Sequence, residues 1–238
     1  MHKKAWIIAK INFRTLGALK FATFTTMLSL FISNLVNFLV WSDNIGTGSD
    51  ISPINALWLL PVMVGIAIPA FSFRRTINLG GKRSNFLWGA VLTYVIIAAI
   101  VSLLIVLSNF TIEPFLERHS YFDPGFLGGI ANLVEVFGWA ERGFAIAFFQ
   151  QFAFLVLFSA FVHTLVAAKS KWYGWVVSVI IIAIISVFTP IAPLRAALVW
   201  FFRMILFHQN AGLQILACLV LATGLFWLSK LIFARRAI

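Results

Sequence analysis

Histidines and carboxylates are the side chains that could carry acid–base or metal chemistry here, and they are few and scattered. The four histidines, at positions 2, 119, 163 and 208, have no partner at metal-ligand spacing, and H-E-x-x-H does not occur. None of the 7 acidic residues lies in the middle of a long apolar run, so no carboxylate pair is available for catalysis in a membrane. Ion-coupled carriers usually need a carboxylate there. The sequence predicts no catalytic residues, no metal site and no ion-coupled carrier.

The stretch Gly80-Gly81-Lys82-Arg83-Ser84 has some features of a phosphate-binding loop but lacks two required residues. That loop needs Gly, four residues, Gly, Lys and then Ser or Thr. Thr76 stands at the first Gly position and Arg83 follows the Lys. We therefore expect no ATP hydrolysis by this chain and no cofactor bound to it.

Three further polar residues beside or inside apolar runs have open interpretations. An ionisable residue inside a membrane segment is by default a candidate for a functional role. His163 is such a residue. Because it lies late in its run, near the inner interface, we expect a neutral ring bonded to a backbone carbonyl. Glu141 and Arg142 lie side by side before the same run. They could contact a headgroup or a peptide, and topology and solubility explain them as well.

The composition places these residues in a membrane protein. Of the 238 residues, 62% are apolar and 11% are charged, against about half and about a quarter in soluble domains. The net charge of +11 would suggest nucleic acid in a soluble protein. Here the charges lie between apolar runs, so we predict a role in membrane orientation and no nucleic-acid partner. Cys218 is the single cysteine, which excludes an intramolecular disulfide.

Six segments reach the roughly 20 apolar residues that a transmembrane helix needs. We predict an all-α membrane protein in which residues 18–238 form one six-span domain, preceded by a cytoplasmic interfacial helix at residues 1–17. The predicted spans cover residues 18–41, 56–73, 86–109, 143–167, 173–190 and 211–233.

The basic residues are strongly biased toward one side of this topology. With six spans, 14 of the 18 lysines and arginines share the side of both termini, and all 7 acidic residues lie on the other side. The positive-inside rule then makes both termini and the loops 74–85 and 168–172 cytoplasmic. The 14 are Lys3, Lys4, Lys10, Arg14, Lys20, Arg74, Arg75, Lys82, Arg83, Lys169, Lys171, Lys230, Arg235 and Arg236.

Three segments outside the spans are predicted to be helical. Residues 191–208 are apolar, but Arg195 and Arg203 make a seventh span costly, so we predict a re-entrant helical hairpin dipping in from the outer face. Residues 1–17 carry Lys3, Lys10 and Arg14 on one helix face; an interfacial helix and a basic tail both fit. The outer loop 110–142 has apolar residues at helical spacing and is predicted to hold a short amphipathic helix.

The loop 74–85 carries a pattern with a known parallel. A helical turn ends at Gly80, and Lys82, Arg83, Phe86 and Gly89 follow. This order resembles the loop between the second and third spans of small bacterial ABC-2-type exporter permeases. The N-terminal helix, six spans, cytoplasmic ends and outer hairpin are similar to that family over nearly the whole chain.

The resemblance implies a permease subunit without its own ATPase. Two permease copies, identical or homologous, would pair in the bacterial plasma membrane above two nucleotide-binding subunits that hold ATP and Mg²⁺. The loop would act as the coupling helix. By resemblance, Ile77 and Leu79 would supply its apolar anchor, and Arg74, Arg75, Lys82 and Arg83 would pair with acidic groups of the ATPase.

The substrate is predicted from the composition of the spans, which favours an amphipathic or hydrophobic peptide, lipid or drug. Polar residues that could line its path are Asn34, Asn37, Gln150 and Gln151, and each serves equally as an interhelical hydrogen-bonding group. Two other functions are weighed: a non-transporting membrane scaffold or sensor, and an intramembrane enzyme, for which no catalytic set can be assembled.

Overall fold

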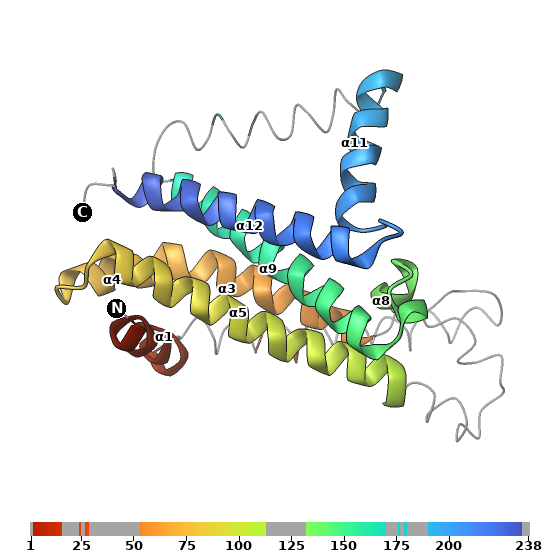
Figure 1. Ribbon diagram of the computed structural model, residues 1–238. Coiled ribbons are helices and arrows are strands. Elements are labelled where there is room, and N and C mark those ends of the chain that lie inside the picture. Colours follow the sequence, from red (N-terminus) through yellow and green to blue (C-terminus); the bar gives the residue numbers. More distant parts are fainter. Residues whose placement is uncertain are drawn as a thin grey trace.

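The computed structural model describes residues 2–15, 24, 27–28, 53–112, 132–169, 176, 179 and 190–234. Every regular segment in these ranges is helical (Figure 1). Four helical stretches are long and apolar enough to cross a bilayer: Ile54–Asn78, Arg83–Thr111, Phe144–Ala168 and Ala211–Ala234. They confirm four of the predicted spans and support a multi-pass membrane protein. The predicted spans 18–41 and 173–190 lie outside the described residues apart from single helical positions.

The first of these stretches is one continuous helical run of changing pitch. It consists of η1 (Pro53–Trp58, a 3₁₀-helix), α3 (Leu59–Ala67), η2 (Ile68–Ser72, a π-helix) and α4 (Phe73–Asn78). Pro69 lacks a backbone N–H, and π-type turns arise where the regular hydrogen-bond ladder is disturbed. The run continues past the predicted end of the span at residue 73, because no helix-breaking residue occurs before Gly80.

The remaining helices follow in a simple order. They are α5 (Arg83–Leu107) with its π-helical end η3 (Ser108–Ile112), α8 (Leu133–Val136), η4 (Ala140–Arg142), α9 (Phe144–Ala168), α11 (Ala192–Ile205) and α12 (Ala211–Ala234). The helix predicted within 110–142 is described only as the single turn of α8.

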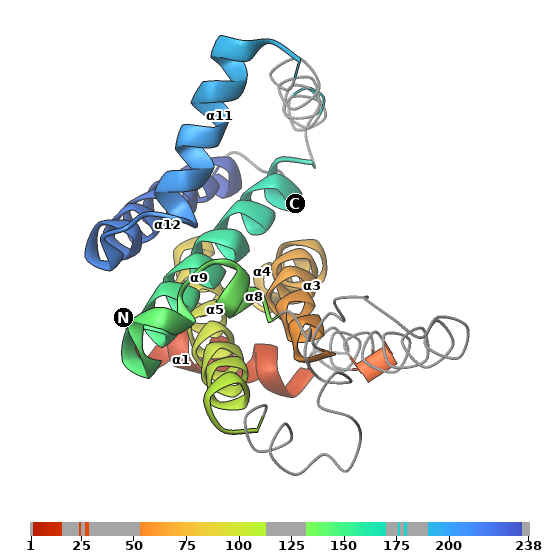
Figure 2. The same ribbon diagram turned by 90° about the vertical axis from the view of Figure 1, so that its right-hand side faces the viewer.

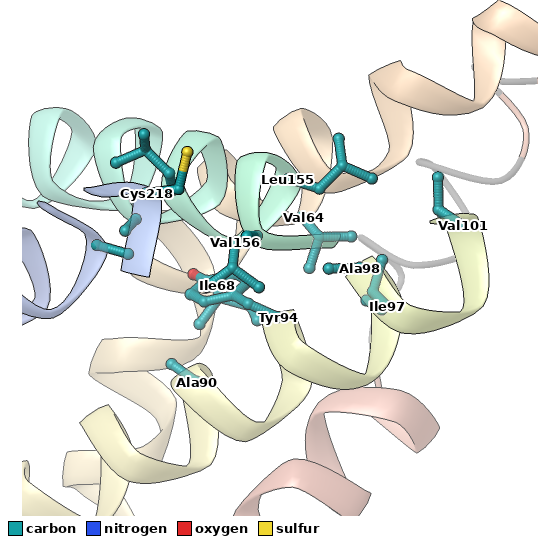
Figure 3. Packing of buried hydrophobic residues seen from close by; sticks show 14 of the residues in the cluster. Val64, Ile68, Ala90, Tyr94, Ile97, Ala98, Val101, Leu155, Val156 and Cys218 are labelled. Atoms are coloured by element: carbon teal, nitrogen blue, oxygen red, sulfur yellow. The ribbon is translucent and has the colours of Figure 1, made fainter. Parts of the chain in front are cut away.

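Helix α9 is the centre of the bundle and packs against α3, α5 and α12. Ile68 of η2, Tyr94 of α5 and Val156 of α9 meet in the core (Figure 3). Gly65 permits the close approach of α3 to α9, because a Cβ there would lie 3.2 Å from the Val162 side chain. Small residues at such contacts let helix backbones approach closely where lipid provides no hydrophobic drive.

The charged residues separate to the two ends of this bundle. We call the end that carries α4, the start of α5 and the ends of α9 and α12 the basic end; its charges are Arg74, Arg75, Lys82, Arg83, Lys169 and Lys230. The other end carries α8 and η4, with Glu135 and Glu141, which are the acidic residues of the described part. This arrangement is the charge separation that the sequence predicts for the two faces of a membrane.

Helix α1 (His2–Thr15) lies across the bundle near the basic end (Figures 1 and 2). It packs on α5 at Gly89, where a Cβ would lie only 2.5 Å from Ile8 Cγ2. Ala9 is buried against the bundle and Lys10 is exposed, as the predicted amphipathic pattern requires, and Trp6 and Ile7 project outward. The segment is therefore a packed helix rather than a basic tail.

The predicted hairpin within residues 191–208 is wrong. The segment forms the single helix α11, and it stands across the direction of the bundle at the end opposite the basic end (Figure 1). Pro193 lies in its first turn, where proline is tolerated, and neither Gly nor Pro follows before Ile205, so nothing breaks the helix. Arg195 and Arg203 are exposed on it.

Candidate functional site

The turn that ends α4 is built by Gly80. Its φ of +76° is a left-handed conformation that favours glycine. The Gly80 N–H donates to the Ile77 carbonyl at 2.9 Å, and the Gly81 N–H donates to the Thr76 carbonyl at 2.9 Å. These bonds form a Schellman motif, which satisfies the last carbonyls of the helix. The link to α5 is thereby reduced to Leu79–Lys82, much shorter than the predicted loop 74–85.

The predicted coupling residues divide into an exposed set and an inward set. Arg74, Arg75 and Lys82 are exposed at the tip of the basic end, and Leu79 is 74% exposed. Ile77 is instead half-buried and packs against the core cluster. The exposed set therefore combines three cations with one large apolar side chain on a short, rigid turn, whereas Ile77 holds that turn to the bundle.

Arg83 is engaged within the subunit. Its guanidinium donates to the carbonyl oxygens of Phe233, at 3.1 Å, and of Ala234, the last residues of α12. A cation at a helix C-terminus is favoured by the unpaired carbonyls and by the helix dipole. The residue thus joins the start of α5 to the end of α12, and only its neighbours in the turn remain directed outward.

An aromatic cluster lies directly beneath this turn. The rings of Phe73, Phe86 and Phe233 are all buried, with centroid separations of 5.3, 4.6 and 5.5 Å. They come from the first residue of α4, the first turn of α5 and the last turn of α12. Close aromatic packing of this kind adds to the energy of burial. A displacement of the turn would therefore be transmitted to α12 as well as to α5.

His163 is the buried histidine of the described core, and its partner differs from the prediction. Nδ1 lies 2.6 Å from the Tyr94 hydroxyl, rather than bonding a backbone carbonyl. The ring also contacts Phe226 and Phe233. The bond joins α5 to α9, and polar side chains commonly hydrogen-bond across helices in this way inside membranes. Nε2 has no hydrogen-bond partner in the described structure.

Gln150 and Gln151 are both fully buried in α9. The amide nitrogen of Gln150 donates to Gln214 Oε1 on α12, which is the interhelical use that the sequence leaves open. Gln214 in turn donates to the Ile205 carbonyl at 2.9 Å, where α11 ends. The amide atoms of Gln151 have no partner in the described structure. Asn34 and Asn37 lie outside the described residues.

At the end opposite the basic end, side chains hold the α11–α12 turn in place. Trp139 Nε1 donates to the Leu206 carbonyl and Arg142 Nη2 donates to the His208 carbonyl, both at 2.9 Å. Glu141 is exposed. The structure therefore gives Arg142 an internal role in fixing the turn.

Over the described ranges, no group of three or more His, Cys, Asp or Glu side chains comes together in a way that could hold a metal ion. Comparisons with protein-family models, with curated proteins and with solved structures find no match to this chain. The resemblance to ABC-2-type permeases therefore stands as a prediction, carried by the residues of the chain itself.

Sequence reasoning missed the partners that these side chains choose. Tyr94 lies within an apolar run, and nothing in the sequence marks its hydroxyl as a hydrogen-bonding partner. Gln214 lies near the start of a span, so it resembles an ordinary interfacial residue. The signal available in retrospect is polarity at a similar depth: Gln150 and Gln214 both lie near the N-terminal ends of α9 and α12, which run in the same direction.

Proposed function

We propose that this chain is the transmembrane permease subunit of an ATP-driven ABC-type exporter, working as a pair of copies in the bacterial plasma membrane. The basic end is taken as cytoplasmic, because lysines and arginines accumulate on that side of membrane proteins. The energy would come from separate nucleotide-binding subunits docked on the basic end. The cargo would be an amphipathic or hydrophobic peptide, lipid or drug.

The observation that carries the proposal is the turn at the end of α4. It presents Arg74, Arg75, Lys82 and an exposed Leu79 at the tip of the basic end. An exposed apolar residue surrounded by cations matches an acidic groove with an apolar pocket on a partner protein.

The rigid base of the turn supports a role in transmitting force. Closure of an ATPase dimer would push on the continuous helical run that reaches back to Pro53. Through the contact of Phe73 with Phe233, it would also push on α12. Packed helices respond to such a push by rigid-body motion. Rocking of the two copies against each other would then expose the cargo path alternately to the two sides.

The test is co-purification of the tagged chain with an ATPase carrying a phosphate-binding loop, followed by ATP hydrolysis in reconstituted vesicles. Leu79→Asp is the discriminating variant, since its side chain is exposed and the change should leave the bundle folded. We expect it to lose the ATPase. Ile77→Asp is unsuitable alone, because Ile77 packs against the core.

Val136→Asp is the matched control, an exposed apolar residue on α8 at the other end of the bundle. It should retain the ATPase as the unaltered chain does. If Leu79→Asp also retains the ATPase, or if the chain purifies with no ATP-hydrolysing subunit, the proposed coupling is wrong.

A further inference from the structure

A groove opens between α5 and α12 near the basic end. Its volume is about 280 Å³, and it is lined by Leu87, Trp88, Val91, Thr223, Phe226, Trp227 and Lys230. An apolar cavity of about 150 Å³ already accommodates a benzene molecule. The groove therefore has room for part of one hydrocarbon chain.

The groove lies between α5 and α12 because α12 packs mainly on α9 and less on α5. At the basic end, beyond the groove, Phe86 contacts Phe233 and Arg83 bonds the end of α12. Phe226, held in the bundle by stacking on Tyr94 at 6.0 Å, is half-buried behind it. The floor is thus fixed by the core, and the groove opens to the surroundings of the bundle.

Its depth in the bilayer follows from helix geometry. Trp88 lies five residues after the start of α5 and Lys230 four residues before the end of α12, which corresponds to about 6–8 Å from the tip at 1.5 Å per residue. Trp88 and Trp227 are 51% and 63% exposed. Tryptophan at this level is typical of the headgroup interface.

Lys230 places a positive charge at the groove. It is exposed, and no described side chain forms an ion pair with it. The acidic residues of the described part, Glu135 and Glu141, lie at the other end of the bundle. A long lysine side chain near a helix end extends its ammonium toward the headgroups.

We propose that this groove binds one anionic phospholipid of the leaflet at the basic end. Lys230 contacts the phosphate and headgroup, the indoles of Trp88 and Trp227 flank the glycerol region, and an acyl chain lies against Val91 and Phe226. The apolar lining recognises the acyl chain, and Lys230, the cation among the described lining residues, selects the negative headgroup. This inference needs only the membrane and is independent of the proposed transport function.

The test is native mass spectrometry of the detergent-purified chain with equal amounts of dioleoyl phosphatidylglycerol and dioleoyl phosphatidylcholine. We expect one retained lipid with about a fivefold preference for phosphatidylglycerol, the ratio that about 1 kcal/mol per lysine gives. Lys230→Gln should abolish the preference, and Val91→Trp, which fills the groove, should abolish retention of both lipids.

Lys10→Gln is the matched control, because it removes an exposed cation on α1 outside the groove. It should keep the preference. Equal retention of the two lipids by the unaltered chain would mean that the groove contacts lipid without selecting its headgroup, and would overturn the proposal. A preference that survives Lys230→Gln would overturn it too, as would displacement of the lipid by glycerol phosphate, which would indicate a soluble ligand.

Discussion

The guanidinium of Arg83 donates a 3.1 Å hydrogen bond to the carbonyl oxygen of Phe233, across 150 positions of the chain. Together with the bond to Ala234 it caps the last helix of the described bundle with the first residue of α5. The turn that projects from the basic end is thus fastened to α12, and a load applied to one is shared by the other.

Replacing Arg83 by Gln should therefore destabilise the folded chain. Hydrogen bonds to charged groups contribute about 1.5–3 kcal/mol, and we expect a loss near the lower figure because one of the two bonds is exposed. The measurement is unfolding by dodecyl sulfate in mixed micelles. Lys82→Gln, an exposed neighbour, should have almost no effect, and equal losses for the two variants would contradict the capping role.

Tyr94→Phe, which removes only the hydroxyl, should lower the free energy of unfolding more than a double variant that removes both hydrogen-bonding groups. The single variant leaves His163 buried with neither ring nitrogen paired, a loss of about 1–3 kcal/mol. The double variant with His163→Phe replaces the pair by apolar rings and should recover much of that loss. A double-mutant cycle of unfolding free energies measures the coupling; simple additivity of the two changes would show that the hydrogen bond contributes nothing.

Gly89→Ala should displace α1 from α5. The new Cβ would lie 2.5 Å from Ile8 Cγ2, closer than van der Waals contact allows. A cysteine placed at Ala9, which is buried in that contact, should then react faster with a maleimide, measured in a Cys218→Ala background. Gly224→Ala is the control, because nothing lies within 4 Å of a Cβ there. Unchanged labelling in Gly89→Ala would mean that the contact is not maintained in the membrane.

Gln214→Leu should destabilise the chain more than Gln150→Leu. Gln214 loses its bonds to both Gln150 and the Ile205 carbonyl, whereas Gln150→Leu leaves the second bond intact. Interhelical hydrogen bonds in membrane proteins contribute about 0.6 kcal/mol on average and up to about 1.7, so the expected difference is within that range. The free energies of unfolding of the two variants can be compared in mixed micelles. A larger loss for Gln150→Leu than for Gln214→Leu would be inconsistent with an anchoring role for Gln214.

Four of the predicted spans, the amphipathic face of α1 and the separation of charge follow from the residues alone. Each depends on local composition: about 20 apolar residues cross a bilayer whatever their neighbours are, and cations stay on one side of it. The glycine that ends α4 could be expected for the same reason, since the left-handed backbone at Gly80 is a local requirement.

The tertiary structure decided which polar side chains pair with each other and how the helices and side chains are oriented. That Arg83 faces inward while Leu79 is exposed, that His163 bonds Tyr94, and that α11 lies across the bundle all depend on contacts between segments distant in the chain. Hydropathy cannot determine such contacts, because inside a membrane every apolar face is equally acceptable to lipid. Close packing and the pairing of the few polar groups choose among those faces, and both exist only once the helices have met.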